Sequence, residues 1–267
     1  METKTILITG STDGIGKLVA IQLAKDGHQM LLHGRNHKKL QETIVEIKAI
    51  TDNGNIHGFV SDLSDFKSIQ KMIAELSDNH SKIDVLINNA GVFKSKIQSN
   101  PYGLDLRFAV NYFAPYLLTN GLMPLLKKSP FPKVINLSSA AQSPVSIEAL
   151  RGNEIVSEQE AYAQSKLALT MWSFHLSKQQ DFLNVVAVNP GSLLNTRMAQ
   201  EAYGQFWSSA DKGAQILYEL AIPNQFTPGA ENYFDNDQGN FSKAHKNAYD
   251  LDLVADLITE TNKILGI

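Results

Sequence analysis

A tyrosine and a lysine stand one helical turn apart in the segment AYAQSK, where Tyr162 precedes Lys166. The chain continues as LALTMWSFHL, which is typical of a helix, and residues at positions i and i+4 share one helix face. Such a pair could move a proton, because a nearby cation lowers the pKa of a phenol from its ordinary value of about 10. By itself the spacing favours a plainer alternative, a surface pair in which the ring covers the lysine stem. Other segments of the sequence must decide between a proton-transferring pair and a surface pair.

A glycine-rich turn, TGSTDGIG, runs from Thr9 to Gly16 between an apolar segment and a helix-like segment. Glycines at 10, 14 and 16 permit a tight turn, close approach of a pyrophosphate to the backbone, and close packing of helix on strand. Because the turn directly follows the first predicted strand, a nucleotide site is favoured over an ordinary turn. The spacing is G-x-x-x-G-x-G instead of G-x-G-x-x-G, and the Gly-Lys-Ser/Thr of a P-loop is absent.

Composition narrows the classes of protein. The 267 residues are 43% hydrophobic and carry a net charge of -3 with no block of like charge, which argues against nucleic-acid partners and membrane-surface patches. The chain has no cysteine, which excludes disulfides, thiolate zinc sites and thiol nucleophiles. No apolar run reaches the 18 residues of a membrane span, and the first apolar run starts too early for a signal peptide. We therefore expect a cytoplasmic protein without a membrane span.

Short apolar runs alternate with longer segments of helical period. Strands are predicted at 5–9, 29–33, 57–60, 84–88, 133–138, 184–189 and 231–235. Helices are predicted near 14–26, 36–51, 64–80, 102–128, 157–180, 209–221 and 247–264, with Pro124 as a possible kink or stop. Repeated βαβ units imply a doubly wound α/β domain with a mostly parallel sheet covered on both faces, most simply one domain over residues 1–267. The irregular stretches 139–157 and 190–208 follow strand ends, where open α/β sheets bind ligands.

The motifs together resemble the short-chain dehydrogenase/reductase family. They occur in the family's order and span residues 5 to about 196: TGSTDGIG, NNAG at 88–91, Asn111, LSS at 137–139, the Tyr162–Lys166 pair and NPG at 189–191. The resemblance implies one Rossmann-like domain with a seven-stranded sheet and a nicotinamide cofactor across the strands' carboxyl ends. AYAQSKLAL is similar to the corresponding helix of the retinol-dehydrogenase-like and protochlorophyllide-reductase-like branches.

The resemblance also assigns catalytic roles. It implies that Tyr162 protonates a carbonyl oxygen as hydride arrives, or acts as the base in reverse, while Lys166 lowers the pKa of Tyr162 and donates to the nicotinamide ribose. Ser139, with Ser138 as its rival, would hydrogen-bond the substrate oxygen, and Asn111 would hold a water in the proton relay. An asparagine inside a helix can also bond a neighbouring strand. Ser139 and Tyr162 are 23 residues apart, a longer interval than in many members, so residues 140–157 must loop out.

The second predicted strand ends in LLHGRN, which bears on the choice of cofactor. Arg35 is suited to the 2′-phosphate of NADP, and no acid that would accept the ribose hydroxyls of NAD occurs at 31–37. Asp13 lies in the glycine-rich turn where some NADP-dependent members of the family carry a basic residue, so it argues mildly for NAD. Predicted cofactor contacts are Gly10, Ser11, Thr12, Asp13, Gly14, Ile15, Gly16, Arg35, Asn36, Asp62, Leu63, Asn89, Ala90, Gly91, Tyr162, Lys166, Pro190, Gly191 and Thr196. Thr196 stands one position later than the family's commonest spacing.

The sequence thus predicts an NADP-dependent oxidoreductase acting on a carbonyl or alcohol carbon. A segment at about 190–208, with Tyr203, Phe206 and Trp207, is expected to cover a medium-sized, mostly apolar aldehyde or ketone. The alternative is a catalytically silent NADP-binding regulator, and a dehalogenating or epimerising relative is a weaker one. His33 and His37 lack a carboxylate ligand pattern, so we expect no metal site and place both near the adenosine. A homodimer or homotetramer is possible.

Overall fold

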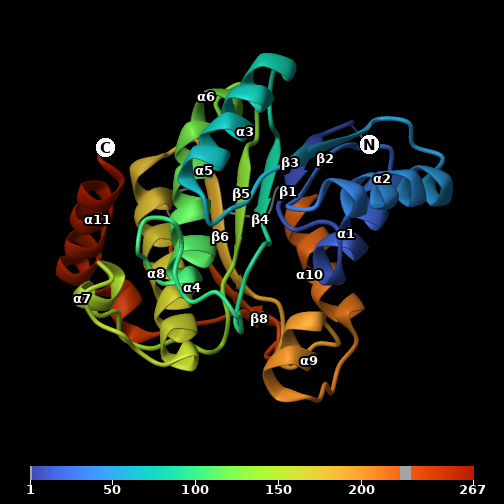
Figure 1. Ribbon diagram of the computed structural model, residues 1–267. Helices are drawn as coiled ribbons and strands as arrows, with labels where there is room; N and C mark the ends of the chain where they lie inside the picture. Colours follow the sequence, from blue (N-terminus) through green and yellow to red (C-terminus); the bar gives the residue numbers. More distant parts are fainter. Residues whose placement is uncertain (1, 223–229) are drawn as a thin grey trace.

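A central sheet organises the computed structural model, which describes residues 2–222 and 230–267, without the side chains of residues 202 and 203. The strand order is β3-β2-β1-β4-β5-β6-β7-β8 (Figure 1). The strands are β1 (Thr5–Ile8), β2 (Gln29–Gly34), β3 (Ile56–Val60), β4 (Val85–Asn88), β5 (Lys133–Leu137), β6 (Asn184–Asn189), β7 (Tyr233–Asp235) and β8 (Asn240–Phe241). β1 to β7 run parallel, and the order reverses between β1 and β4, the position at which sheets of this type bind dinucleotides.

The sequence predicts seven strands, and all seven are present. The predicted total is wrong by one, because β8 returns antiparallel to β7 after a tight turn in which Gly239 N donates to Asp235 O (2.8 Å). Two residues are too few to give a recognisable strand pattern, so the sequence could not indicate this addition.

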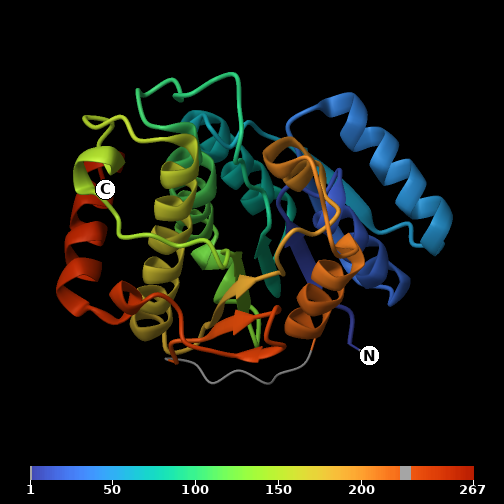
Figure 2. The ribbon, with the colours of Figure 1, turned by 90° about the horizontal axis from the view of Figure 1, so that it is seen from below.

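Helices cover both faces of the sheet (Figure 2). One face carries α1 (Gly14–Lys25), α2 (His37–Thr51) and α10 (Ala210–Ala221), and the other carries α3 (Phe66–Asn79), α5 (Ala114–Gly121) and α8 (Glu158–Gln179). Strand side chains alternate between the two cores: Ile6 and Ile8 pack with the first group of helices, while Leu7 packs with the second. Burial on both faces explains why β1 reads as a continuous apolar run.

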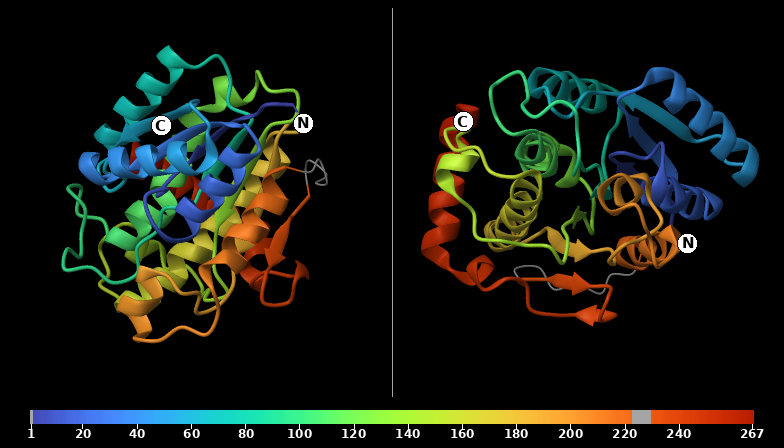
Figure 3. Two further views of the ribbon diagram at one scale, coloured as in Figure 1. Left: turned by 90° about the vertical axis from the view of Figure 1, so that its right-hand side faces the viewer. Right: turned by 60° about the horizontal axis from the view of Figure 1, so that its bottom comes forward.

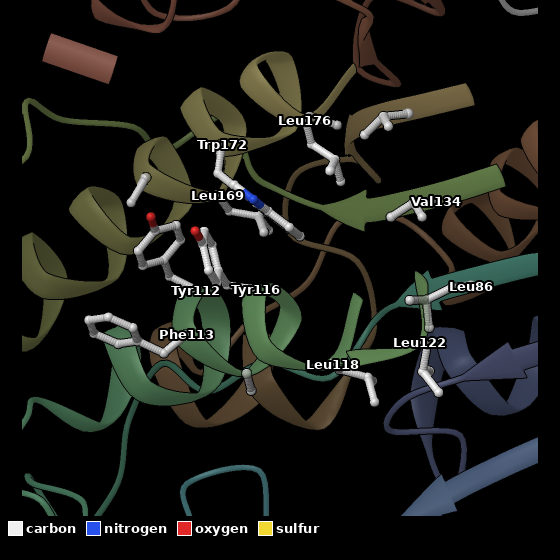
Figure 4. Packing of buried hydrophobic residues seen from close by; sticks show 14 of the residues in the cluster. Leu86, Tyr112, Phe113, Tyr116, Leu118, Leu122, Val134, Leu169, Trp172 and Leu176 are labelled. Carbon is white, nitrogen blue, oxygen red and sulfur yellow. The ribbon is translucent and has the colours of Figure 1, made fainter. Parts of the chain in front are cut away.

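The C-terminal helix α11 (Leu251–Leu265) lies beside α8 on the outside of the molecule (Figure 3). Two tyrosines under it bond to its side chains: the Tyr112 hydroxyl lies 2.7 Å from Thr261 Oγ1, and Tyr116 donates to Asn262 Oδ1 (2.6 Å). The same two rings pack towards Trp172 of α8 (Figure 4), and the Tyr116 and Trp172 ring centroids are 5.3 Å apart. The chain end is therefore integrated into the core through buried aromatic residues.

The predicted helix at 102–128 is wrong as a single element. It divides into α4 (Leu106–Phe108), the π-helical turn η1 (Ala109–Phe113), α5 and α6 (Met123–Leu126). A π-turn adds a residue to one turn, which an apolar pattern of period 3.6 does not reveal. Pro124 lies in the first turn of α6, where its missing N–H costs little, so it begins a helix instead of kinking one.

The two stretches predicted to be irregular each contain a short helix. α7 (Ile147–Leu150) lies in the first, and α9 (Arg197–Tyr203) lies in the second. The last predicted helix begins as a 3-10 turn, η2 (Lys246–Tyr249), before Asp250 starts α11 by accepting from the backbone N–H groups of Asp252 and Leu253.

Candidate active site

A cavity of about 390 Å³ opens at the carboxyl ends of β5 and β6, at the lower edge of the sheet in Figure 1. Its walls come from the loop after β4, the loop after β5, helix α8 and the segment after NPG. The lining residues are Ile15, Phe93, Ser138, Ser139, Ala140, Ala141, Tyr162, Asn189, Pro190, Gly191, Ser192, Leu193, Leu194, Thr196, Met198 and Ala199. The catalytic candidates Tyr162 and Ser139 therefore border one space.

Tyr162 and Lys166 share a face of α8, as their spacing predicts. Lys166 Nζ lies 5.6 Å from the centroid of the Tyr162 ring, and the edge of Phe93 packs on the same ring with centroids 4.7 Å apart. Lys166 is only 4% exposed, and burial lowers its pKa to about 7. A buried lysine does not fit the plainer alternative of a surface pair.

The Lys166 amino group is anchored to the end of β5. Nζ donates to the Leu137 carbonyl at 2.6 Å, the one hydrogen bond found for it among the described residues. An ammonium has three donors, so two of them have no acceptor among the described residues. A Cβ placed on Gly91 would lie 3.6 Å from Nζ, so the backbone of the NNAG motif borders the same amino group.

The two serines after β5 have different surroundings. The Ser138 hydroxyl is buried against α8, where it donates to the Lys166 carbonyl (3.0 Å) and lies 2.7 Å from Thr170 Oγ1. Ser139 Oγ accepts from the backbone of Ala141 (3.1 Å), which leaves its proton free to donate elsewhere. This difference supports Ser139 over Ser138 as the group that meets a substrate.

Two side chains hold the Ser139 backbone. Its carbonyl accepts from the Tyr233 hydroxyl (3.0 Å) and from Gln142 Nε2 (2.9 Å), although Tyr233 lies far along the chain on β7. Gln142 in turn accepts from the His245 N–H (3.2 Å). Residues 140–157 do loop out, and these bonds fix the serine at the start of the loop.

Asn111 lies in the π-turn η1 and is fully buried. Its Oδ1 accepts from Val92 N (2.8 Å), and its Nδ2 donates to Val92 O (3.0 Å) and to Ser165 Oγ (3.0 Å). The side chain therefore joins the loop after β4 to α8. The sequence left two roles open for Asn111, a structural hydrogen bond to a neighbouring segment and a place in the proton relay. The structure shows structural hydrogen bonds, and the relay role stays a prediction.

The glycine-rich turn fits closely against the end of β4. A Cβ on Gly10 would lie 2.9 Å from Ala90 Cα, and one on Gly16 would lie 2.4 Å from Gly10 O. Asn89 Nδ2 ties the two loops together by donating to Thr9 O (2.8 Å) and to Gly10 O (3.0 Å). These two glycines are required by the packing of the chain itself.

Gly14, by contrast, lies close to another segment, the start of α9, and has a φ of +51°, which favours glycine. A Cβ placed on it would meet only the Thr196 side chain, at 3.6 Å, and Thr196 begins α9 on the opposite side of the cleft by accepting from Ala199 N (3.2 Å). The late position of Thr196 in the sequence therefore does not remove it from the cleft. The N-terminus of α1 therefore lies next to α9 across the cleft, and a helix N-terminus favours an anion such as a pyrophosphate.

His33, on the neighbouring strand β2, holds the glycine-rich turn through a hydrogen bond. Its Nδ1 accepts from the Gly10 N–H (3.1 Å), so Nε2 carries the proton and donates to Ser61 O (3.0 Å). Burial lowers the pKa of His33, which keeps the ring neutral. Ser11 completes this support, because its Oγ accepts from the His33 N–H (2.9 Å).

At the end of β2, Arg35 is exposed and Asn36 begins α2 by accepting from Lys39 N (2.9 Å). Asp13 accepts from Gly14 N (2.8 Å) and forms an ion pair with Lys39, whose Nζ lies 2.7 Å from Asp13 Oδ2. Lys39 was not indicated by any sequence motif. The only signal for it is its position in the first turn of the helix after Arg35.

The remaining predicted cofactor residues lie along the same edge of the sheet. The Asp62 carboxylate accepts from Ser64 N (2.9 Å) and Ser64 Oγ (2.7 Å), while Leu63 is buried. In the NPG turn, the Pro190 carbonyl accepts from Asn236 (2.8 Å) and Gly191 has a φ of 121°, which favours glycine.

A buried arginine that the sequence analysis missed braces the loop carrying Phe93. Arg107 is fully buried, its Nε donates to Phe93 O (3.0 Å), and its Nη2 lies 2.6 Å from Glu158 Oε1 at the start of α8. Nη1 pairs with Asp105 at 3.0 Å. Arg107 thereby holds Phe93 against Tyr162, and nothing in its local sequence distinguishes it from a surface arginine.

The described part of the chain shows neither a metal-binding cluster nor a membrane-spanning helix. Within residues 2–222 and 230–267, no group of three or more histidine and acidic side chains is arranged to hold a metal ion. None of the helices in the described part of the chain combines the length and apolar character that crossing a membrane requires.

Comparisons with known proteins place this geometry in context. A family model for the short chain dehydrogenases matches residues 4–205. Retinol dehydrogenase 13 of Homo sapiens is 31% identical over 252 residues, which cover 87% of this chain and 76% of that protein. Polyprenol dehydrogenase of Homo sapiens is 29% identical over 255 residues, covering 88% of this chain and 77% of that protein.

Solved structures share the fold. An uncharacterised protein from Mycobacterium paratuberculosis superposes with a TM-score of 0.79 at 25% identity, over 98% of this chain and 92% of that chain. A short chain dehydrogenase from Escherichia coli, solved with NADPH, has a TM-score of 0.72 at 25% identity, over 88% of this chain and 97% of that chain.

Proposed function

The chain belongs to the short-chain dehydrogenase/reductase family, in the branch that contains retinol dehydrogenases, and on this basis we propose that it is an NADP-dependent oxidoreductase. Its reaction transfers hydride between the nicotinamide and the carbonyl or alcohol carbon of a medium-sized, mostly apolar aldehyde or ketone. The observation that carries the proposal is the convergence of Tyr162, with the buried Lys166 beneath it, on the cavity that Ser139 also borders.

In the reductive direction Tyr162 donates its proton to the carbonyl oxygen, and bound NADPH supplies the hydride to the carbonyl carbon. Ser139 donates a hydrogen bond to the same oxygen and so favours the negative charge that develops there. The Lys166 cation stabilises the resulting phenolate of Tyr162. In the oxidative direction the same phenolate removes the proton from the alcohol.

The shape of the cleft supports a dinucleotide. Gly10 and Gly14 have φ values of +64° and +51° in the turn that leads into α1, and a helix N-terminus favours the phosphates. The two donors of Lys166 that have no acceptor among the described residues suit the hydroxyls of the nicotinamide ribose. Arg35 is exposed at the end of β2, where a guanidinium binds the 2′-phosphate of NADP.

The lining of the cavity supports an apolar substrate. Phe93, Leu193, Leu194 and Met198 border it, and each buried methylene contributes about 0.8 kcal/mol to binding. The proposed cover at 190–208 adds Trp207, which is 74% exposed. Tyr203 belongs to the same cover, but its side chain lies outside the described residues. The names of two relatives, retinol dehydrogenase and polyprenol dehydrogenase, point to alcohols with a long apolar body.

A panel of aldehydes and ketones tests the reaction class. We expect turnover with NADPH, followed by absorbance of the reduced cofactor, and kcat/KM that rises with chain length until the cavity is full. Trp207→Ala should flatten this dependence. Faster turnover of sugars or short hydroxy acids than of every apolar carbonyl would contradict the substrate class, and the oxidoreductase proposal would stand.

Cofactor preference has its own test. NADPH is expected to bind more tightly than NADH by roughly ten- to a hundredfold, because a guanidinium–phosphate bond contributes about 1.5–3 kcal/mol. Arg35→Ala should remove most of that preference. Equal affinities in the wild type would contradict it.

A further inference from the structure

Tyr233, on β7, donates its hydroxyl proton to the backbone carbonyl of Ser139 (3.0 Å), although the two residues are 94 positions apart. Tyr233 lies after residue 205, where the match to the family model ends, and none of the sequence motifs includes it. The proposed hydride transfer does not use it either. Its contact with the residue that is proposed to meet the substrate oxygen therefore needs an explanation of its own.

The sheet does not hold the peptide group that follows Ser139. Pairing of β5 with β6 ends at Leu137, opposite Val188, so Ser139 lies beyond the last paired position. The chain then enters the long stretch 140–157, which precedes α8. Because the Ser139 hydroxyl oxygen accepts from Ala141 N (3.1 Å), its position depends on the direction of that peptide. A rotation of the peptide would move the hydroxyl within the cavity.

Two donors fix the carbonyl of this peptide. One is the Tyr233 hydroxyl, and the other is Gln142 Nε2 (2.9 Å), whose own side-chain oxygen accepts from His245 N (3.2 Å). Tyr233 is 4% exposed, and burial is the main cause that raises its pKa, so the hydroxyl keeps its proton and remains a donor. A carbonyl that accepts two hydrogen bonds cannot rotate without losing one of them.

A purely structural explanation is available for any buried tyrosine, because a buried hydroxyl requires an acceptor. Tyr116 illustrates it: the side chain is 6% exposed, its hydroxyl donates to Asn262 on α11, and it is not among the residues that line the cavity. Tyr233 differs in its acceptor, which belongs to a residue that borders the cavity. A structural hydroxyl affects folding alone, whereas a hydroxyl that acts on Ser139 affects turnover as long as the serine is present.

Resting on the proposed function, we propose that Tyr233 is a positioning residue for the reaction. Its hydroxyl fixes the peptide that follows Ser139 and so holds the serine proton in the direction of the substrate oxygen. The bond from Ser139 to that oxygen strengthens as negative charge develops there, so an error in its direction reduces kcat more than it reduces substrate affinity. Gln142 assists Tyr233 by holding the same carbonyl from within the loop.

A double-mutant cycle with Tyr233→Phe and Ser139→Ala tests this inference, with reduction of apolar aldehydes by NADPH as the assay. Tyr233→Phe keeps the buried ring and should lower kcat about three- to tenfold, with KM for the aldehyde and affinity for NADPH changed by less than about twofold. In the Ser139→Ala background the same substitution should change kcat by less than about twofold, because no serine hydroxyl is left to position.

Two further variants complete the design. Tyr116→Phe is the matched control, since it also removes a buried hydroxyl and should leave kcat at the wild-type value. Gln142→Met removes the other donor to the Ser139 carbonyl, should lower kcat only while the serine is present, and replaces Tyr233→Phe in the cycle if that variant does not fold. Thermal unfolding of each variant checks that it is folded.

The outcomes separate this inference from the proposed function. With an active wild type, a loss of kcat in Tyr233→Phe that is equal in both backgrounds overturns the positioning role alone. Unchanged kcat in Tyr233→Phe, or an equal loss in Tyr116→Phe, also overturns it. If Ser139→Ala itself leaves kcat unchanged, the role of the serine and this inference are both wrong, and the oxidoreductase class stands. A wild type that reduces no aldehyde overturns the proposed function and this inference together.

Discussion

The nucleotide end and the substrate end of the cleft are held in place by different kinds of contact. The glycine-rich turn is fixed by partly buried bonds to His33 of β2 and to Asn89, which directly follows β4. The segment after NPG is held by bonds nearer the surface, such as the backbone bond from Asn195 N to Ser208 O (2.7 Å) and the bond from Ser192 N to the Asp237 carboxylate (2.8 Å). A turn held by partly buried bonds suits a dinucleotide that binds in one fixed position, and a segment held near the surface suits the proposed cover over apolar substrates.

The largest expected effect is on kcat and comes from Tyr162, which lies between the nucleotide end and the substrate end of the cleft. Tyr162→Phe should lower kcat by about 10²–10⁴-fold, the range for loss of a general acid, while leaving NADPH affinity nearly unchanged. Rapid kinetics and equilibrium titration measure the two quantities separately. Tyr102→Phe is the control, because Tyr102 is a partly exposed tyrosine that bonds Asp65 away from the cavity. A Tyr162→Phe enzyme that keeps more than about a tenth of wild-type kcat would contradict the role of Tyr162.

A pair of glycine substitutions compares the two ends directly. Gly16→Ala places a Cβ 2.4 Å from the Gly10 carbonyl and should cost about 3 kcal/mol of unfolding free energy. Gly204→Ala, after α9, meets nothing within 4 Å at a φ of +67° and should cost only about 1 kcal/mol. Urea unfolding measures both. Equal losses would mean that the turn is no more tightly braced than the cover.

The nucleotide end was also the more predictable from sequence. The turn TGSTDGIG and the strand before it are local patterns, and the structure places them as the resemblance to the family implies. The pairing of Tyr162 and Lys166 was likewise readable from helical spacing. What the sequence could not provide were contacts between distant segments, such as Tyr233 with Ser139 and Arg107 with Glu158.

The errors have related physical causes. The π-turn η1 was not predicted because one extra residue in a single turn leaves the apolar periodicity almost unchanged. Lys39 was overlooked because its partner lies 26 positions earlier, so the pair exists only once α2 packs beside the glycine-rich turn. Local sequence patterns therefore predicted the motifs. The residues that support the motifs could be identified only from the fold, because they come from distant parts of the chain.

A smaller effect separates the two serines after β5. Ser139→Ala should lower kcat by roughly ten- to a hundredfold, since it removes a donor to an oxygen that becomes negative, and should leave stability within about 0.5 kcal/mol. Ser138→Ala should do the opposite, costing about 1 kcal/mol of stability through its lost bonds to α8 while kcat stays near the wild-type value. Reversed results would assign the substrate contact to Ser138.

The smallest expected effect is on stability and depends on pH. Burial lowers the pKa of Lys166 to about 7, so below that pH a charged amine is buried without compensation from solvent. Lys166→Met should therefore stabilise the ligand-free protein at pH 7 and below by about 1 kcal/mol. The gain is smaller than the full free-energy cost of burying the charged amine, because the variant also loses the hydrogen bond to Leu137 O.

The sign of that pH dependence is fixed by proton binding. Between about pH 7 and the unfolded pKa of about 10.4, the unfolded state binds more protons at Lys166 than the folded state, so wild-type stability rises with pH relative to the variant. The advantage of Lys166→Met should shrink over this window in urea unfolding series. If the stability advantage of Lys166→Met grew with pH instead, burial would not be lowering the pKa of Lys166.

Hydride transfer itself is the most direct test of the account. The protein is supplied with NADPH deuterated at the transferring position of the nicotinamide and with a panel of apolar aldehydes and ketones, and the products are analysed by mass spectrometry. We predict alcohol products that carry the deuterium on the former carbonyl carbon, formed about 10²–10⁴-fold more slowly with Tyr162→Phe. If NADPH binds but no carbonyl in the panel yields a deuterated alcohol, the protein is a silent NADP-binding member of its family and the central claim is wrong.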